Sequence, residues 1–135
     1  MFHLSIVTPE RIYFDAEVNS LIIPGSEGYL GVLPHHAPLI TALKPGKVEF
    51  TDENNKHHVL AVSGGFLEVS KNQANLLVEA VESSDEIDIE RAKLALKNAK
   101  EALNDSEKRD ELEIQALQAA LARAANRIKV YKETH

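Results

Sequence analysis

Apolar and polar residues alternate in short runs over the first half of the chain. The runs cover residues 2–6, 18–23, 47–51, 57–63, 66–70 and 75–81, and turn-forming residues such as Pro24-Gly25 and Gly64-Gly65 separate them. Short strands at spacings of about 8–12 residues are typical of an antiparallel sandwich or barrel. The pattern predicts no long helix before residue 85.

The period changes in the last third of the chain, where apolar residues recur every three or four positions. The first stripe consists of Ile89, Ala92, Leu96, Ala99 and Leu103, and the second of Ile114, Leu117, Leu121, Ala124, Ile128 and Tyr131. The polar segment Asn104-Asp105-Ser106 separates them, so the stripes predict an antiparallel helical hairpin. Much of the seam is alanine, which buries little apolar area. The alanines indicate either close helix packing alone or a hairpin that is marginal by itself and able to leave its partner.

Composition divides the chain at about the same place. All six glycines lie at or before Gly65 and all five prolines at or before Pro45. Residues 1–86 carry 5 basic and 12 acidic side chains, hence −7, whereas residues 87–135 carry 10 and 9, hence +1. The polar stretch 82–86 suits a boundary and the cap of a following helix. We therefore expect two domains, residues 1–84 and residues 85–135.

The overall composition excludes several classes of protein. A net charge of −6 argues against broad nucleic-acid binding, and the lack of cysteine excludes thiol catalysis, disulfides and Cys-ligated metals. No apolar run is longer than four residues, as at residues 59–62, or five at residues 29–33 if Gly31 is counted, which is too short to span a bilayer. The first residues lack the basic and apolar regions of a signal peptide. These features predict a soluble, intracellular protein.

Catalytic motifs are absent from the sequence. The pairs His35-His36 and His57-His58 have no HxH or HExxH spacing, and adjacent residues of a strand point to opposite faces. The glycine-rich segment Gly25–Gly31 contains an acid and precedes no predicted helix, so it is a poor phosphate cradle. We expect no catalytic residues and no metal site, and a His-dependent metallohydrolase remains a distant alternative. The residues favour a binding or regulatory module.

One cluster of charged residues suggests an anion site. Asp88 and Arg91 lie three apart at the start of the first predicted helix, and Arg123 and Arg127 lie four apart near the end of the second. In an antiparallel hairpin these positions meet at the open end, together with a helix N-terminus that attracts anions. The alternative is that Asp88 pairs with Arg123 or Arg127 across the hairpin. The residues alone leave both readings open.

Three segments in order resemble the epsilon subunit of the bacterial F-type ATP synthase. Residues 28–39 (GYLGVLPHHAPL) are similar to the family's GxxGxLPxHxPL segment, and residues 63–69 (SGGFLEV) are similar to its glycine-containing hairpin. The opening residues 4–10 (LSIVTPE) also fit. The resemblance implies a β-sandwich of about ten antiparallel strands in two sheets, followed by a C-terminal α-helical hairpin.

The resemblance also implies a non-catalytic place in the central stalk of the complex, peripheral to the cell membrane on its cytoplasmic side. Its sandwich is expected to join the gamma subunit to the c-ring during proton-driven ATP synthesis. The residues that match the family's ring-facing loop are Ser26, Glu27, Gly28, Tyr29 and Leu30, and His36 matches part of the gamma-facing surface. The family's hairpin can extend along gamma and inhibit ATP hydrolysis in the head of alpha and beta subunits. As an extended helix, residues 87–132 would span about 70 Å.

The basic end of the hairpin fits that role. After Ile114 the chain has four basic residues, Arg123, Arg127, Lys129 and Lys132, against one acid, Glu133. The family's beta subunits present an acidic segment to this tip. The alternative is that the cations only complement the helix C-terminal dipole, and both readings are compatible.

A subset of the family binds ATP on the folded hairpin, through an I/L-D-x-x-R-A motif. Residues 87–92 match this motif, two arginines of the second helix match, and Glu82 aligns with a nearby carboxylate. The implied ATP site consists of Glu82, Ile87, Asp88, Arg91, Ala92, Arg123 and Arg127. Asn98 departs from the arginine of well-known ATP-binding members, which removes one charged phosphate donor. ATP, with or without Mg²⁺, would be a regulatory ligand and not a required cofactor. The rival reading is a free-standing nucleotide-sensing adaptor with the same hairpin.

Overall fold

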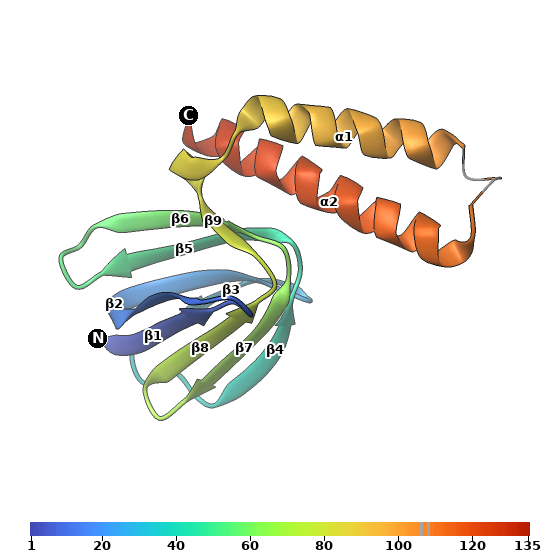
Figure 1. The fold of residues 1–135 in the computed structure, drawn as a ribbon. Coiled ribbons are helices and arrows are strands. Elements are labelled where there is room, and N and C mark those ends of the chain that lie inside the picture. The colour runs from blue at the N-terminus through green and yellow to red at the C-terminus, as the bar shows by residue number, and fades with distance from the viewer. Residues whose placement is uncertain (106, 108) are drawn as a thin grey trace. The chain divides into compact units, whose positions relative to one another are not determined.

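The computed structural model describes residues 1–105, 107 and 109–135. The described residues separate into two compact units, Met1–Ser83 and Ser84–His135. The first consists of strands and the second of helices, as Figure 1 shows. Of the predicted turn Asn104-Asp105-Ser106, the last residue lies outside the described residues.

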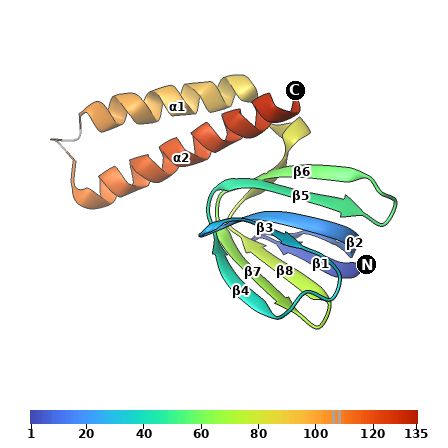
Figure 2. The ribbon, with the colours of Figure 1, turned by 180° about the vertical axis from the view of Figure 1, so that it is seen from behind.

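The described residues of the first unit form nine strands. Their bounds are β1 Phe2–Val7, β2 Ile12–Gly25, β3 Gly28–Val32, β4 Leu39–Leu43, β5 Gly46–Asp52, β6 His57–Val62, β7 Gly65–Ser70, β8 Gln73–Val78 and β9 Val81–Ser83. Hydrogen bonds connect them in the order β1-β8-β7-β4-β2-β5-β6-β9, and β3 pairs with β2. Figures 1 and 2 show the two layers from opposite sides.

The long strand β2 is shared by both layers. Its first half pairs with β1, and its second half pairs with β3 and β5 and meets β4 at Gly25. The β-sandwich is confirmed, with two differences in detail. The described residues form nine strands instead of about ten, and one of them, β2, runs unbroken through the layer boundary. The β1–β8 pair is parallel, whereas all other strand pairs of the described residues are antiparallel.

Alternating residues of the strands fill the space between the layers. Along β1 the pattern of burial is strictly alternating, with Phe2, Leu4 and Ile6 buried. Further core residues come from β2, β5, β7 and β8. The sandwich therefore has a continuous apolar core that does not depend on a ligand.

The second unit is a short 3-10 turn, η1 Ser84–Glu86, followed by α1 Ile89–Asn104 and α2 Glu111–Thr134. The two helices lie side by side and antiparallel (Figures 1 and 2). The predicted stripes form the seam, since Ala92, Ala99 and Ala124 are buried and the other stripe residues are partly buried. Val130, which the stripes did not include, is also buried. The predicted helical hairpin is confirmed.

Candidate functional site

The first helix begins at one of the proposed ATP-binding residues. Asp88 is the N-cap of α1, and its Oδ1 accepts a hydrogen bond from the backbone N–H of Arg91 at 3.1 Å. The side chains of Asp88 and Arg91 are exposed at this helix end. Their neighbours in the motif, Ile87 and Ala92, are buried.

The length of the helices brings the second pair of residues to the same end. Ala92 lies 12 residues before the last residue of α1, and Arg123 lies 12 residues after the first residue of α2 (104 − 92 and 123 − 111). By the same count, Asp88 is level with Arg127, 16 residues from the turn on each side (104 − 88 and 127 − 111). An antiparallel hairpin therefore places the four charged residues of the predicted cluster within about one helical turn of one another along the hairpin axis.

Contacts at the open end agree with this register. His135 Nε2 lies 3.6 Å from Asp85 Oδ1, and the His135 ring stacks on Tyr131 with centroids 4.1 Å apart. The residue after α2 thus meets the turn that precedes α1. At its open end the hairpin therefore has a contact between His135, which follows α2, and Asp85, which precedes α1.

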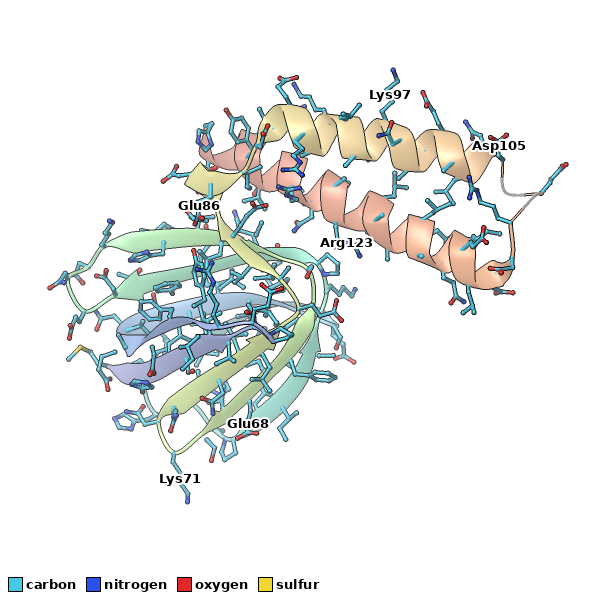
Figure 3. All side chains as sticks on the ribbon, viewed as in Figure 1. Glu68, Lys71, Glu86, Lys97, Asp105 and Arg123 are labelled. Carbon is cyan, nitrogen blue, oxygen red and sulfur yellow. The ribbon has the colours of Figure 1, made fainter. Side chains whose placement is uncertain are left out.

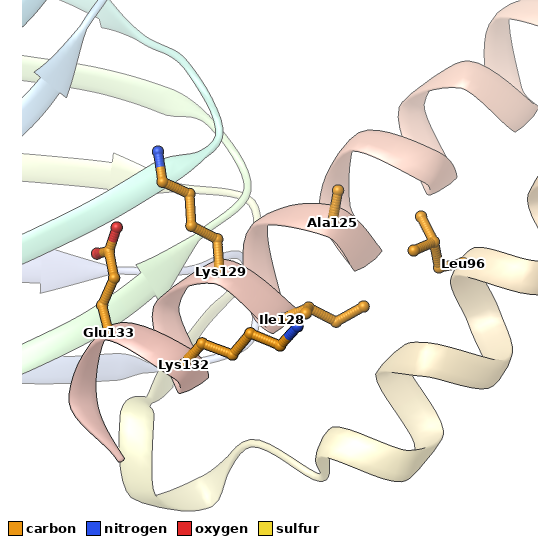
Figure 4. Close-up of a pocket in the computed structure, with 6 residues that line it drawn as sticks. All are labelled: Leu96, Ala125, Ile128, Lys129, Lys132 and Glu133. Carbon is orange, nitrogen blue, oxygen red and sulfur yellow. The ribbon is translucent and has the colours of Figure 1, made fainter.

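The basic residues in the second half of α2 lie on two different flanks of the helix. Successive residues of a helix turn by about 100°, so Arg123 and Arg127 share one flank of α2, beside the seam. On the opposite flank is a groove of about 430 Å³, shown in Figure 4. Its lining residues are Leu96, Ala125, Ile128, Lys129, Lys132 and Glu133. The arginine cluster and this lysine-bordered groove are separate features.

Two further residues bear on the proposed nucleotide site. Asn98, which stands in place of an arginine, is exposed on α1. Glu82 lies in β9, opposite Ala61 of β6, and so belongs to the sandwich unit. Figure 3 labels Arg123 and Lys97 on the hairpin, and Lys97 is exposed as well. By the register of the helices, Asp88, Arg91, Arg123 and Arg127 lie at similar levels along the hairpin axis, whereas Glu82 belongs to the other unit.

His36 lies in the turn between β3 and β4. Its backbone N–H donates to the Leu33 carbonyl at 3.2 Å, and its Nδ1 donates to the Ala37 carbonyl at 2.7 Å. These bonds fix the imidazole within its own loop. Leu33, Ala37 and Pro38 around it are exposed. His36 thus lies in an exposed apolar loop, and its imidazole is hydrogen-bonded within that loop.

An exposed apolar row crosses the outer face of the β1-β8-β7-β4 layer. Val7 is registered with Leu77, Leu77 with Phe66, and Phe66 with Ala42. Phe66 is 58% exposed, Leu77 54%, and Ile40, two residues before Ala42 on the same face, 74%. We call these five residues the apolar row. Exposed apolar residues that adjoin one another in this way make the row a candidate interaction site.

The predicted ring-facing segment is a tight hairpin. Ser26 and Glu27 form the turn between β2 and β3, and Gly28 has a φ of 132°, which favours glycine. Tyr29 is exposed, and its hydroxyl oxygen accepts from the backbone N–H of Lys47 at 3.2 Å. Leu30 is partly buried and packs against the core. The turn at Ser26 and Glu27 is therefore exposed, whereas the strand that follows it is held by the contacts of Tyr29 and Leu30.

The histidine pair of β6 behaves as its position in a strand predicts. His58 faces inward, stacks on Phe50 at 4.5 Å, and lies 2.9 Å from Asp52 Oδ2, whereas His57 is exposed. The hydrogen bonds from the His58 imidazole and the Lys56 N–H hold the pKa of Asp52 below its usual value of 3.8. Within residues 1–105, 107 and 109–135, no group of three or more His, Asp or Glu side chains is arranged to hold a metal ion.

Sequence reasoning missed the apolar row. Its signal is present in the runs Phe66-Leu67 and Leu76-Leu77-Val78, because consecutive apolar residues in a strand place one of them on each face. The groove bordered by Lys129 and Lys132 was also not predicted. The position of this groove depends on which flanks of α1 and α2 face each other. The helical period alone does not predict that.

A β-sandwich with an exposed apolar row, followed by a helical hairpin with an alanine seam, defines a non-enzymatic architecture of two domains. Comparison with known families makes this specific. Residues 1–84 match the β-sandwich domain of the ATP synthase delta/epsilon chain, and residues 85–132 match its long alpha-helix domain. The chain belongs to the ATP synthase delta/epsilon chain family.

Individual relatives cover nearly the whole chain. It is 44% identical to the ATP synthase epsilon chain of Desulforamulus reducens, over 93% of either chain. It is 45% identical to that of Moorella thermoacetica, over 94% of this chain and 93% of the relative. A chain in the structure of the Euglena gracilis mitochondrial ATP synthase, with OSCP, F1 and c-ring, superimposes with a TM-score of 0.80 at 25% identity, covering 98% of this chain and 80% of that one.

Proposed function

We propose that this chain joins the gamma subunit to the c-ring in the central stalk of ATP synthase and regulates ATP hydrolysis through its helical hairpin. As a member of the epsilon-type family it is a stalk subunit and not one of the catalytic subunits. The observation that carries the proposal is the apolar row on the sandwich, because a large exposed apolar surface needs a partner.

The apolar row, together with the His36 loop, is the proposed contact for gamma. Phe66→Gln should weaken binding of purified gamma at least tenfold, since a central aromatic residue of an interface commonly contributes about 2 kcal/mol or more. Ile22→Gln is the matched control, because Ile22 is an exposed apolar residue of β2 that lies outside the apolar row. Binding would be followed by calorimetry. Equal affinity of the Phe66 variant and wild type would exclude this surface.

The exposed turn at Ser26 and Glu27 is the proposed contact for the c-ring. Support comes from its place at the tip of a fixed hairpin and from the c-ring in the complex of the Euglena relative. Among the described residues, no helix is both long and apolar enough to cross a membrane. The chain would therefore associate peripherally with the cytoplasmic face of the cell membrane through its partner subunits.

The helical hairpin is the proposed inhibitory element. Its seam rests on small residues, so α2 can separate from α1 at modest cost and extend toward the alpha and beta subunits. A chain ending at Ser84 should still assemble and support ATP synthesis, while ATP hydrolysis by the complex should rise. Unchanged hydrolysis in an assembled complex would show that residues 85–135 do not inhibit.

ATP is the proposed regulatory ligand of the folded hairpin. Asp88, Arg91, Arg123 and Arg127 meet at one end only when α1 and α2 are paired, so a ligand that bridges them stabilises the folded form. Arg91→Ala and Arg123→Ala should each weaken ATP binding, and Asn98→Arg should tighten it. Lys97→Ala, on a different face of α1, is the control. ATP titration by calorimetry tests this, and equal affinity of wild type and Arg91→Ala would remove the site.

A further inference from the structure

One side chain links three distant segments of the sandwich. Oδ1 of Asn72 accepts a hydrogen bond from the backbone N–H of His35 at 2.8 Å, and its Nδ2 donates to the Met1 carbonyl at 2.9 Å. The backbone carbonyl of Asn72 also accepts from the N–H of His3 at 3.2 Å. Asn72 therefore ties the β7–β8 turn to the start of the chain and to the loop before β4.

The backbone at both ends of the Asn72–His35 bond is unusual. Asn72 has a φ of 59° and His35 a φ of 64°, in the left-handed region that side chains other than Asn, Asp and Gly rarely adopt. Asn tolerates this conformation, whereas His35 needs support from its surroundings. The hydrogen bond from His35 to Asn72 supplies that support from outside the loop.

The loop held in this way is an exposed apolar element. Leu33 is 63% exposed, Ala37 and Pro38 are exposed, and the loop leads directly into Ile40 of the apolar row. Within the loop, the His36 N–H donates to the Leu33 carbonyl and closes a turn. Left to itself, such a short loop would sample other conformations and would lose entropy on docking.

We infer that Asn72 is a positioning residue for partner binding, which holds the Leu33–Pro38 loop in its docking conformation. The inference rests on the proposed function, in which this loop and the apolar row contact gamma. Asn72 acts through the loop and does not itself contact the partner. It raises the fraction of molecules whose loop is ready to dock, and the apparent affinity scales with that fraction.

Asn72→Gly is the sharpest test, because glycine accepts a positive φ without strain and removes both side-chain hydrogen bonds. Affinity for purified gamma should fall roughly three- to thirtyfold, as expected if the docking-ready fraction falls to about a third to a thirtieth. Amide hydrogen exchange at His35 and His36 should accelerate. Asn72→Asp keeps an acceptor for the His35 N–H and should restore most of the affinity. Lys71→Gly, at the neighbouring residue with a φ of 52°, controls for an added glycine in the same turn and should bind as wild type.

The outcomes separate this inference from the proposed function. If Phe66→Gln leaves gamma binding unchanged, the proposed surface is wrong. If Phe66→Gln abolishes binding while Asn72→Gly changes neither affinity nor exchange, the positioning role alone is wrong. A faster exchange with unchanged affinity also overturns it. Should glycine unfold the sandwich, Asn72→Asp carries the test, and a loss of affinity above tenfold with normal melting would contradict the inference.

Discussion

Asp88 has two roles in the hairpin that a pair of substitutions can separate. Its carboxylate caps α1 through the Arg91 N–H at 3.1 Å, and it also belongs to the proposed ATP site. Asparagine caps a helix about as well as aspartate, whereas alanine does not. Asp88→Asn therefore removes the charge and keeps the cap, and Asp88→Ala removes both.

The expected magnitudes differ for the two roles. Loss of the cap should cost about 1 kcal/mol of helix stability, and it should do so whether α1 is paired with α2 or extended, because α1 is helical in either case. A carboxylate repels phosphate, so its part in ATP binding must be to accept a hydrogen bond from a hydroxyl or amino group, or to orient an arginine. Loss of such a charge-assisted bond costs about 1.5–3 kcal/mol, or roughly ten- to a hundredfold in affinity.

Far-UV circular dichroism would follow thermal unfolding, and calorimetry would follow ATP binding, both on the full chain. We expect Asp88→Asn to melt like wild type and bind ATP at least tenfold more weakly. Asp88→Ala should be impaired in both measurements. If the asparagine variant melts as early as the alanine variant, the capping argument is wrong. If it binds ATP like wild type, Asp88 is a structural cap only.

Three further predictions concern the sandwich. Gly65→Ala should destabilise the sandwich by about 3 kcal/mol or more in urea unfolding. The reason is that an added Cβ would lie 2.0 Å from the Leu77 carbonyl oxygen, at a φ of 145°. The control Gly31→Ala should change stability little, because a Cβ there would have no atom within 4 Å. The lowered pKa of Asp52 stabilises the fold above the unfolded value of 3.8, and this contribution is lost as pH falls through the folded pKa. The stability difference between wild type and Asp52→Asn should therefore shrink with acidification, and a difference constant from pH 2 to 6 would refute the assignment. Glu27→Trp at the exposed turn should reduce proton-driven ATP synthesis without lowering the melting temperature, and unimpaired synthesis would count against the c-ring contact.

The alternating strands could be predicted from the sequence, because burial of one face leaves a period of two. The pattern failed at β3, which contains the exposed Gly31, and at β4, where the outward residues Ile40 and Ala42 are apolar and so hide the alternation. It also missed the first half of β2, whose residues are mostly exposed or partly buried at the layer boundary. Strands that depend on pairing more than on burial leave little trace in a hydrophobic pattern.

The candidate sites also differ in how far the sequence alone predicts them. The level of Asp88 with Arg127 along the hairpin follows from helix length and chain reversal alone, so the sequence predicts that their side chains are near one another. The apolar row requires the register of four strands, and each of its residues is unremarkable in its own strand. The Asn72 contacts join the segments around residues 1, 35 and 72, and the sequence does not reveal that these meet. Local periodicity therefore predicts helix-based sites better than sheet-based ones.

The alanine seam also bears on how a small ligand could control the proposed movement of the hairpin. The buried seam residues Ala92, Ala99 and Ala124 each contribute only about 0.8 kcal/mol of apolar burial or less, which conformational entropy largely offsets. Contacts at the open end, such as His135 with Asp85, are exposed and add at most about 1 kcal/mol. A ligand that binds only the folded form stabilises it by about 2.7 kcal/mol at a hundredfold excess over its Kd. Occupancy of the proposed site would decide whether the hairpin stays closed if the folded and extended forms differ by less than about 2.7 kcal/mol. Replacing Ala99 and Ala124 by leucine would overpack the seam and should favour the extended form, so both relief of inhibition and ATP binding should require higher ATP concentrations. Hydrolysis assays across ATP concentration test this, and an unchanged ATP dependence would refute it.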